Sequence, residues 1–354
     1  AWRIAISKKT RLSAMTVRVG INGFGRIGRS FWRAVQKNGA DIDIVAVNDL
    51  GDKKTMAHLL KYDSVMGVLA DTVTSTDDGI VINGKKLQVL SERDPAKLPW
   101  KQLGVDVVVE STGFFTERDK AAAHLAAGAR VVIISAPATG ADATFVYGVN
   151  HTDFDAAKHQ VVSNASCTTN CFVPLVKVLD DAFGVINGMM TTVHAYTGDQ
   201  MLVDGPHKDL RRARGAAINI TPTSTGAARA TSLVMESMKG KLDGTSLRVP
   251  LPTGSITDFV ANLKTQASVE EIKAAFATAA NGPLRGVLEY CTDPIVSSDV
   301  VGNPHSCVFD ADLTMSMSSG NGGSMVKVFG WYDNEWGYSS RLADLSVHIG
   351  RSLS

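Results

Sequence analysis

The chain has 354 residues, which is more than one hydrophobic core usually holds, so two domains are expected. Hydrophobic residues make up 44% of the chain and charged residues 20%, as in an ordinary globular protein. Its 36 Lys and Arg nearly balance its 35 Asp and Glu, which excludes a global field that would gather nucleic acid or an anionic membrane surface.

The four cysteines are too few for a disulfide scaffold in a chain of this length. They form no Cys-x-x-Cys pair and have no histidine at zinc-finger spacing, so no metal site is expected. The simplest interpretation is a set of reduced thiols in a cytoplasmic protein, one of them a candidate reactive group. No apolar run reaches the roughly 18 residues that a bilayer span requires.

The first 14 residues differ in character from the rest of the chain. They carry Arg3, Lys8, Lys9 and Arg11 without an acidic residue. A basic, acid-poor start is typical of an organelle transit peptide. We favour the alternative, an extension that is disordered or not native to the fold, with Met15 as the true start.

Strands and helices alternate through the first half of the chain. Val17–Asn22 and Ile42–Asn48 have the apolar runs of buried strands, and Phe24–Lys37 between them has helical apolar spacing. Asn83-Gly84 lies between β-rich flanks and indicates a hairpin. The other expected elements are helices at Met56–Tyr62 and Arg118–Ala127 and strands at Val105–Glu110, Arg130–Ser135, Phe145–Val149 and Gln160–Val162. This alternation predicts a parallel sheet covered on both faces.

Beyond Asn164 the expected strands follow one another without helices between them, which predicts a largely antiparallel second sheet in an α+β domain. Ser316–Ser324 has the composition of a loop, and Gly337–Leu353 is an amphipathic helix that we expect to pack back on the first domain. The remaining elements are strands at Val185–Ala195, Thr245–Asn262 and Ser324–Trp331, and helices at Cys167–Ala182 and Val269–Ala280.

A glycine-rich loop connects the first strand to the first helix. Residues 23–28 (GFGRIG) match G-x-G-x-x-G, and Asp49 ends the second strand, 21 positions after Gly28. Gly23 permits a tight turn, Gly25 lets backbone N–H groups approach a pyrophosphate, and Gly28 allows close packing of helix on strand. Asp49 would bind ribose hydroxyls and repel a 2′-phosphate, so the pattern predicts NAD rather than NADP.

One cysteine and one histidine are candidates for nucleophilic chemistry. Cys167 is expected at the start of a helix, where the helix dipole and free N–H groups lower the pKa of a thiol. Cys171, one turn later, is expected in the core. His194 ends a strand before a polar loop and is a candidate base. Position alone does not select it from the eight histidines of the chain.

The segments INGFGRIGR, SNASCTTNC, HAYTGDQ, RRARGAA, TSTGAARA and WYDNEWGYS, in this order, resemble the NAD-dependent, phosphorylating glyceraldehyde-3-phosphate dehydrogenases. The resemblance runs from about residue 16 to the C-terminus. It implies an NAD-binding Rossmann-like domain at residues 15–165, a catalytic α+β domain at 166–333, and a C-terminal helix at 334–354 that returns to the NAD domain. It also implies a cytoplasmic homotetramer without a membrane or dedicated nucleic-acid site.

The resemblance also implies roles by position, with Cys167 as nucleophile and His194 as base. The positions that bind the substrate phosphate and inorganic phosphate are Ser166, Thr168, Thr197, Arg214, Thr225, Gly226 and Arg248. The positions that bind the cofactor are Gly23, Gly25, Arg26, Ile27, Gly28, Asp49, Leu50, Arg93, Ser111 and Asn334. Leu50 and Gly205-Pro206 resemble the NAD-preferring members, whereas Asp199 stands where Thr is common. A surface basic run stays an alternative for Arg211 and Arg212.

The implied reaction oxidises D-glyceraldehyde 3-phosphate to 1,3-bisphosphoglycerate, through a thiohemiacetal and a thioester on Cys167, as NAD is reduced. An alternative within the class is a relative that acts on a longer sugar phosphate such as erythrose 4-phosphate. An NAD-independent cysteine hydrolase or acyltransferase would leave the glycine loop and Asp49 without a function. A non-catalytic nucleotide-binding or scaffolding protein is the third possibility.

Overall fold

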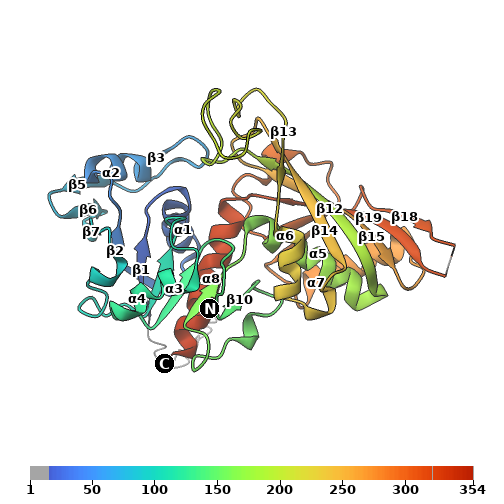
Figure 1. Ribbon diagram of the computed structural model, residues 1–354, viewed down its shortest axis with the longest axis horizontal. Helices are drawn as coiled ribbons and strands as arrows, with labels where there is room; N and C mark the ends of the chain where they lie inside the picture. Colours follow the sequence, from blue (N-terminus) through green and yellow to red (C-terminus); the bar gives the residue numbers. More distant parts are fainter. Residues whose placement is uncertain (1–15, 321, 354) are drawn as a thin grey trace, which may run out of the picture.

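The computed structural model describes residues 16–320 and 322–353, so the prediction for residues 1–14 lies outside the described residues. Two lobes are visible in Figure 1, each built around one large sheet. The C-terminal helix α8 (Trp336–Ser352) runs between them (Figure 1). The predicted fold class, a Rossmann-like domain with an α+β domain, is confirmed.

The first sheet has the strand order β10-β11-β9-β8-β1-β2-β7-β6-β5. Neighbours are parallel from β10 to β7, and the last two pairings are antiparallel. Because β1 lies between β2 and β8, the strand order reverses there, and a crevice forms at the carboxyl ends of these strands. The strands are β1 (Val17–Asn22), β2 (Ile42–Asn48), β5 (Val73–Thr76), β6 (Gly79–Ile82), β7 (Lys85–Leu90), β8 (Val107–Glu110), β9 (Val131–Ile134), β10 (Ala143–Thr144) and β11 (Val161–Ser163).

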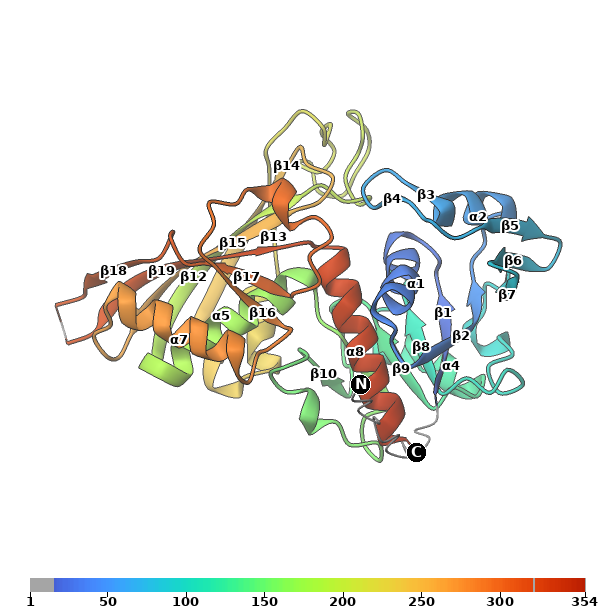
Figure 2. The ribbon, with the colours of Figure 1, turned by 180° about the vertical axis from the view of Figure 1, so that it is seen from behind.

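Helix α8 belongs to the core of this lobe although it follows the second lobe in sequence. It lies beside α1 and β1 (Figure 2) and also packs against β8. Its Leu342, Leu345 and Ile349 are fully buried with Val19 and Phe31. The remaining elements of the lobe are α1 (Arg26–Asn38), α2 (Lys53–Lys61), α3 (Arg118–Ala121), α4 (Ala123–Ala126) and the small ladder of β3 (Tyr62–Asp63) with β4 (Gly67–Val68). The end of the chain therefore lies close to the beginning of the fold.

The second sheet has the order β13-β14-β12-β15-β19-β17-β16, with β18 beside β19. It is mostly antiparallel; β12–β14 and β16–β17 are parallel pairs. The long helices α5 and α7 pack together, and α5 packs on β12, β15, β17 and β19. The elements are α5 (Cys167–Phe183), β12 (Val185–Ala195), β13 (Thr221–Ser224), α6 (Ala227–Ala230), β14 (Leu242–Val249), β15 (Ser255–Leu263), α7 (Val269–Asn281), β16 (Leu288–Cys291), β17 (Cys307–Asp310), β18 (Met315–Ser318) and β19 (Ser324–Tyr332).

Several predicted elements are wrong in detail. The strand predicted at Phe145–Val149 is a turn, because the Asn150 side chain accepts from Val146 N at 2.8 Å and donates to Thr144 O at 2.9 Å. The single strand predicted at Thr245–Asn262 is divided by a turn in which Gly254 has a φ of +88°.

Two further predictions need correction. The helix predicted at Arg118–Ala127 is interrupted at Ala122 and forms the short helices α3 and α4. The loop predicted at Ser316–Ser324 begins inside β18, whose Ser316 and Ser318 pair with Val326 and Ser324 of β19. An edge strand built from polar and Met residues has no apolar alternation by which its sequence could reveal it.

Candidate active site

The glycine-rich loop forms a tight turn between β1 and α1. Gly23 has a φ of +94°, a conformation that side chains disfavour. A Cβ on Gly28 would lie 2.2 Å from the Gly23 carbonyl oxygen, so only glycine permits this contact between helix and loop. Gly25 is the N-cap of α1; its Cβ position meets nothing of the described chain within 4 Å, and no described side chain caps the helix. The first N–H groups of α1 are thus available to an anion.

A cavity of about 400 Å³ opens beside this loop at the carboxyl ends of the strands. It brings together six of the predicted cofactor positions, namely Gly23, Gly25, Asp49, Leu50, Arg93 and Ser111. The other lining residues, which no sequence motif indicated, are Asn22, Asn48, Glu92, Thr112, Phe114 and Phe115. Their places at or just after the ends of β1, β2, β7 and β8 were the available signal, since ligands of such sheets bind at these strand ends.

Several predicted cofactor residues make contacts within the protein. Asp49 Oδ2 accepts from Phe24 N at 2.7 Å, and Ser111 Oγ donates to Gly23 O at 2.6 Å, so both support the loop. Arg26 forms ion pairs with Asp63 and with Glu335, the residue before α8. Ile27, in the first turn of α1, is partly buried.

Cys167 is the first residue of α5, after a strained turn. Ala165, a buried non-glycine residue, has a φ of +55°. Tyr338 of α8 donates to its carbonyl oxygen at 3.0 Å, and Ser163 Oγ accepts from its N–H at 3.0 Å. Ser166 caps the helix by accepting from Thr169 N at 3.0 Å. Strain of this kind persists only where surrounding contacts impose it, and it is common at functional sites.

His194, near the end of β12, lies against Cys167. Its Nε2 is 3.3 Å from the Cys167 Sγ, and its Nδ1 is 2.7 Å from Ala195 O and 3.0 Å from Arg248 Nη1. Nδ1 can therefore donate to a carbonyl or accept from a guanidinium, which lets Nε2 either accept or carry a proton. A general base requires both states.

Burial opposes charge on both members of this pair. It raises the pKa of Cys167 to about 11, although the Arg248 charge and Thr168 hydrogen bonds lower it. Burial, and then Arg248, lower the pKa of His194 to about 3. The predicted lowering of the cysteine pKa is therefore wrong for this structure, because desolvation outweighs the helix start. Burial therefore disfavours a thiolate or an imidazolium that forms without the other.

Arg248 is the cation nearest the pair. It is the register partner of His194 in the β12–β14 ladder, and its Nη1 lies 3.4 Å from Thr197 Oγ1. Its buried Nε has no hydrogen-bond partner among the described residues. A buried donor without a partner is costly, so this atom is suited to an incoming anion.

The predicted hydroxyl positions are partly engaged. Thr168 Oγ1 lies 2.9 Å from Tyr332 Oη, and Thr225 Oγ1 accepts from Ala227 N at 3.2 Å. Gly226, the residue before α6, is exposed, and its Cβ position meets no described atom within 4 Å.

Arg214 does not join this group. Its Nε pairs with Asp204 at 2.9 Å, and its side chain is 63% exposed. Arg212 is 21% exposed, pairs with Asp199, and lies close enough to Arg248 to lower its pKa. Of the two, Arg212 lies near Arg248 and Arg214 pairs with Asp204; the anion-binding role of Arg214 stays a prediction. The loop lacks the periodicity that would show which of its arginines faces inward.

Asn334 lies between the cysteine and the glycine loop. It is buried, and its Oδ1 accepts from Ser255 Oγ at 2.9 Å, which fixes the orientation of its amide. Two residues earlier, the Tyr332 ring centroid is 5.9 Å from that of His194; one residue later, Glu335 pairs with Arg26. This segment contacts both the cysteine–histidine pair and the dinucleotide loop.

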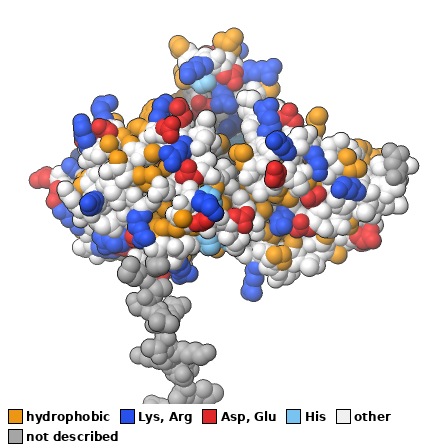
Figure 3. Space-filling view, turned by 60° about the horizontal axis from the view of Figure 1, so that its bottom comes forward, with side chains coloured by type: hydrophobic (Ala, Val, Ile, Leu, Met, Phe, Trp, Pro, Cys, Tyr) orange, Lys and Arg blue, Asp and Glu red, His pale blue; other side chains and the backbone are white. Residues whose placement is uncertain are grey.

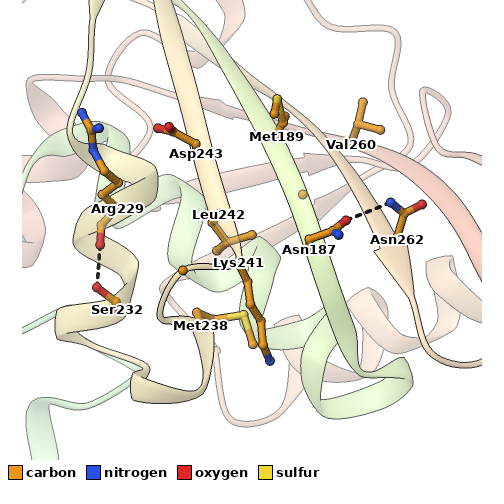
Figure 4. Close-up of a pocket in the computed structure, with 12 residues that line it drawn as sticks. Asn187, Met189, Arg229, Ser232, Met238, Lys241, Leu242, Asp243, Val260 and Asn262 are labelled. Atoms are coloured by element: carbon orange, nitrogen blue, oxygen red, sulfur yellow. Dashed lines mark hydrogen bonds between the residues drawn. The ribbon is translucent and has the colours of Figure 1, made fainter.

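Other surfaces were compared with this site. A cavity of about 720 Å³ lies on β12, β14 and β15 near α6, but its lining offers Met189, Met238 and Leu242 and has neither Cys nor His (Figure 4). Figure 3 shows Lys and Arg side chains interspersed with Asp and Glu on the face it presents. Within residues 16–320 and 322–353, no group of His, Cys, Asp or Glu is arranged to hold a metal. No described helix is both long and apolar enough for a membrane span.

Comparisons with known proteins agree with this arrangement. Residues 17–118 match the family model for the NAD-binding domain of glyceraldehyde 3-phosphate dehydrogenase, and residues 166–334 match the model for its C-terminal domain. Glyceraldehyde-3-phosphate dehydrogenase 2 of Streptomyces avermitilis is 59% identical over 339 residues, which cover 96% of this chain and all of that protein. The glyceraldehyde-3-phosphate dehydrogenase of Mycobacterium avium is 60% identical over 345 residues, with the same coverage.

We predict that His194→Asn slows alkylation of Cys167 by iodoacetamide at pH 7 at least tenfold. The thiol loses the group that accepts its proton as the new C–S bond forms, and burial keeps its pKa high, so little thiolate is available without that acceptor. Mass spectrometry of the Cys167 peptide measures the rate. His58→Asn, at an exposed site on α2, is the control. An unchanged alkylation rate in His194→Asn would show that the imidazole does not activate the thiol.

Proposed function

Because the chain belongs to the glyceraldehyde-3-phosphate dehydrogenase family, we propose that Cys167 and His194 carry out the oxidation of the aldehyde. The chain is an NAD-dependent oxidoreductase that converts D-glyceraldehyde 3-phosphate and inorganic phosphate to 1,3-bisphosphoglycerate, a reaction of glycolysis. The observation that carries the catalytic proposal is the 3.3 Å contact between Cys167 Sγ and His194 Nε2, beside Arg248.

In the first step the thiol adds to the aldehyde carbon. Its proton passes to His194 Nε2 as the C–S bond forms, and then to the former carbonyl oxygen, giving a thiohemiacetal. The pKa values oppose separate charges, but the thiolate and imidazolium would arise 3.3 Å apart and attract each other strongly in a buried site. Proton transfer is therefore coupled to attack instead of preceding it.

In the second step His194 Nε2 removes the hydroxyl proton and the carbon loses a hydride. NAD, when bound, supplies the hydride acceptor. The product is a thioester on Cys167, and His194 then carries the proton. An oxygen of inorganic phosphate attacks the thioester carbon, the sulfur leaves, and Cys167 recovers its proton from the imidazolium.

The residues of the first lobe fit NAD. The uncapped N-terminus of α1 would bind the pyrophosphate, and Asp49 would accept from ribose hydroxyls at the edge of the cavity. Arg26 and Ile27 lie in the turn that forms this site. Leu50 and Phe114, which are 52% and 81% exposed, offer apolar surface to a flat base. The amide of Asn334 would orient the nicotinamide carboxamide.

The residues around Cys167 fit two anions, the substrate phosphate and inorganic phosphate. Guanidinium groups and hydroxyls are the donors that phosphate oxygens prefer. The proposed set is Ser166, Thr168, Thr197, Arg212, Thr225, Gly226 and Arg248.

Self-association would cover apolar side chains of the second lobe. Met189 on β12 is 72% exposed, and Leu202, Leu210 and Ile218 in the loops after it are 79%, 81% and 83% exposed. Met189 projects from the strand face drawn in Figure 4. Apolar surface of this extent marks an interface. We therefore propose a homotetramer, while the cytoplasmic location and the domain limits at 165/166 and 333/334 stay predictions.

The phosphorylating mechanism predicts that NADH forms from D-glyceraldehyde 3-phosphate only when inorganic phosphate is present. Cys167→Ser should reduce the rate at least about 1,000-fold, since the thioester cannot form, while NAD binding changes little. Absorbance of NADH measures the rate, and Cys291→Ser is the matched control. Turnover that ignores phosphate, or that prefers erythrose 4-phosphate, would contradict the proposal.

Arg212 and Arg214 give a matched pair of variants. Arg212→Ala should raise the KM for phosphate or for the aldehyde about tenfold or more, because a charge-assisted hydrogen bond is lost. Arg214→Ala should change either constant less than about threefold, since an exposed ion pair contributes little. Steady-state kinetics with each substrate varied in turn provides the comparison. The opposite ranking would return the anion site to Arg214.

The proposed interface predicts a mass in solution four times that of the chain. Met189→Glu places a charge in the apolar face and should yield smaller species at micromolar concentration. Light scattering after size exclusion gives the mass, and Glu236→Gln is the surface control. A wild-type monomer would exclude the tetramer.

A further inference from the structure

A buried chain of hydrogen bonds lies beneath the cofactor cavity, and the mechanism above does not use it. It contains Trp100, His124 and Glu110, whose side chains are at most 2% exposed. Glu110 is the last residue of β8, and His124 belongs to α4. Ionisable side chains are seldom buried so fully unless their hydrogen bonds are satisfied.

Four donors surround the Glu110 carboxylate. Oε1 accepts from the backbone N–H of Thr112 at 2.8 Å and from its Oγ1 at 2.5 Å. Oε2 accepts from Asn22 Nδ2 at 2.6 Å and lies 3.0 Å from His124 Nε2. A carboxylate is suited to this place because it accepts only; a group with a donor would oppose one of its neighbours.

Trp100 fixes the direction of the hydrogen bond from His124. The indole Nε1 donates to His124 Nδ1 at 3.0 Å, and an indole nitrogen can only donate. Nδ1 therefore carries no proton, Nε2 carries one, and Nε2 donates to Glu110. The ring is also fixed by contacts with Trp100 and Phe115, at centroid distances of 6.2 and 6.4 Å.

The chain continues across the ends of neighbouring strands. Asn22 Oδ1, at the end of β1, accepts from Asn48 Nδ2 at the end of β2, 2.7 Å away. Asn48 in turn bonds both backbone groups of Glu92 at 2.8 Å. Asn22, Asn48, Glu92 and Thr112 all line the cofactor cavity. One buried carboxylate thus connects four residues of the cavity wall.

We propose that Glu110 is a positioning residue for the cofactor site: it holds the cavity wall in the conformation that binds the nucleotide half of NAD. This rests on the proposed assignment of the cavity to the cofactor. Glu110 bonds to Thr112 and Asn22, which line the cavity together with Asp49, Leu50 and Phe114. A wall that is ordered before binding avoids the entropy that ordering it would cost.

Glu110→Gln is the sharpest test, because it keeps the shape and replaces one acceptor by a donor. The new NH₂ group faces either the two donors of Thr112 or those of Asn22 and His124. The wall must then shift, or a buried donor loses its partner, so we expect the Kd for NAD to rise about fivefold or more. ADP-ribose should lose the same factor, since Asn334, the residue that would hold the nicotinamide, does not line this cavity. The KM for NAD should rise while kcat changes less than twofold.

Two variants in the same chain of hydrogen bonds distinguish a positioning role of Glu110 from a general effect on stability. Trp100→Phe, two bonds away, keeps all four donors of Glu110; its Kd for NAD should change less than twofold, although loss of a fully buried indole lowers the melting temperature. His124→Phe removes one donor, keeps an aromatic ring beside Phe115, and should raise the Kd about threefold. It carries the test if Glu110→Gln does not fold.

Calorimetry with NAD and with ADP-ribose, beside thermal unfolding of the full chain, gives all the measurements. The inference is supported if the loss of NAD affinity is largest in Glu110→Gln, smaller in His124→Phe and smallest in Trp100→Phe. Losses of NAD affinity that rank with the losses in melting temperature would overturn it. So would a Glu110→Gln variant that binds NAD as tightly as the wild type. Asp49→Ala is the control for the cavity itself. If this variant binds NAD as the wild type does, the assignment of the cavity to the cofactor fails. If Asp49→Ala loses NAD affinity and Glu110→Gln does not, only the role of Glu110 is rejected.

Discussion

The contact between the Cys167 thiol and the His194 imidazole is the constraint on which the site depends. Burial raises the pKa of the thiol to about 11 and lowers that of the imidazole to about 3, so neither group charges readily alone. At a distance of 3.3 Å, a thiolate and an imidazolium that form together would attract each other strongly. The second sheet maintains this distance, because α5 carries the cysteine, packs on β12, and thereby faces the histidine. Proton transfer between the two groups is then favoured as the C–S bond forms, because neither charge has to arise alone.

The C-terminal segment joins this pair to the cofactor lobe. Tyr332 reaches Thr168 and Thr192, Glu335 pairs with Arg26, and Tyr338 holds the carbonyl of the strained Ala165. Helix α8 then buries its apolar face against α1 and β1. A segment far from Cys167 in sequence therefore fixes both the nucleophile turn and its relation to the dinucleotide loop. Such a link gives hydride transfer the fixed geometry that it requires.

Much of this could be predicted from local pattern. The bounds of β1, β2 and β12 agree with the apolar runs that predicted them, and the glycine loop lies between strand and helix as its motif requires. Predictions failed where a contact with a residue outside the local pattern determines the structure. Asn150 turns the segment that resembled a strand at Phe145–Val149. Which arginine of the loop lies near Arg248 likewise depends on the fold, since Arg212 lies there and Arg214 pairs with Asp204.

Taken by itself, the sequence determined where backbone freedom and helix starts occur, because glycine spacing and apolar period act within a few residues. It thereby placed Gly23 in its turn and Cys167 at the start of α5. Only the tertiary structure determined the pKa shifts of the site residues. The register of β12 on β14 sets Arg248 beside His194, and enclosure by the sheet raises the cysteine pKa instead of lowering it. Desolvation and charge pairing depend on what surrounds a group in space, and neighbours along the chain do not specify that.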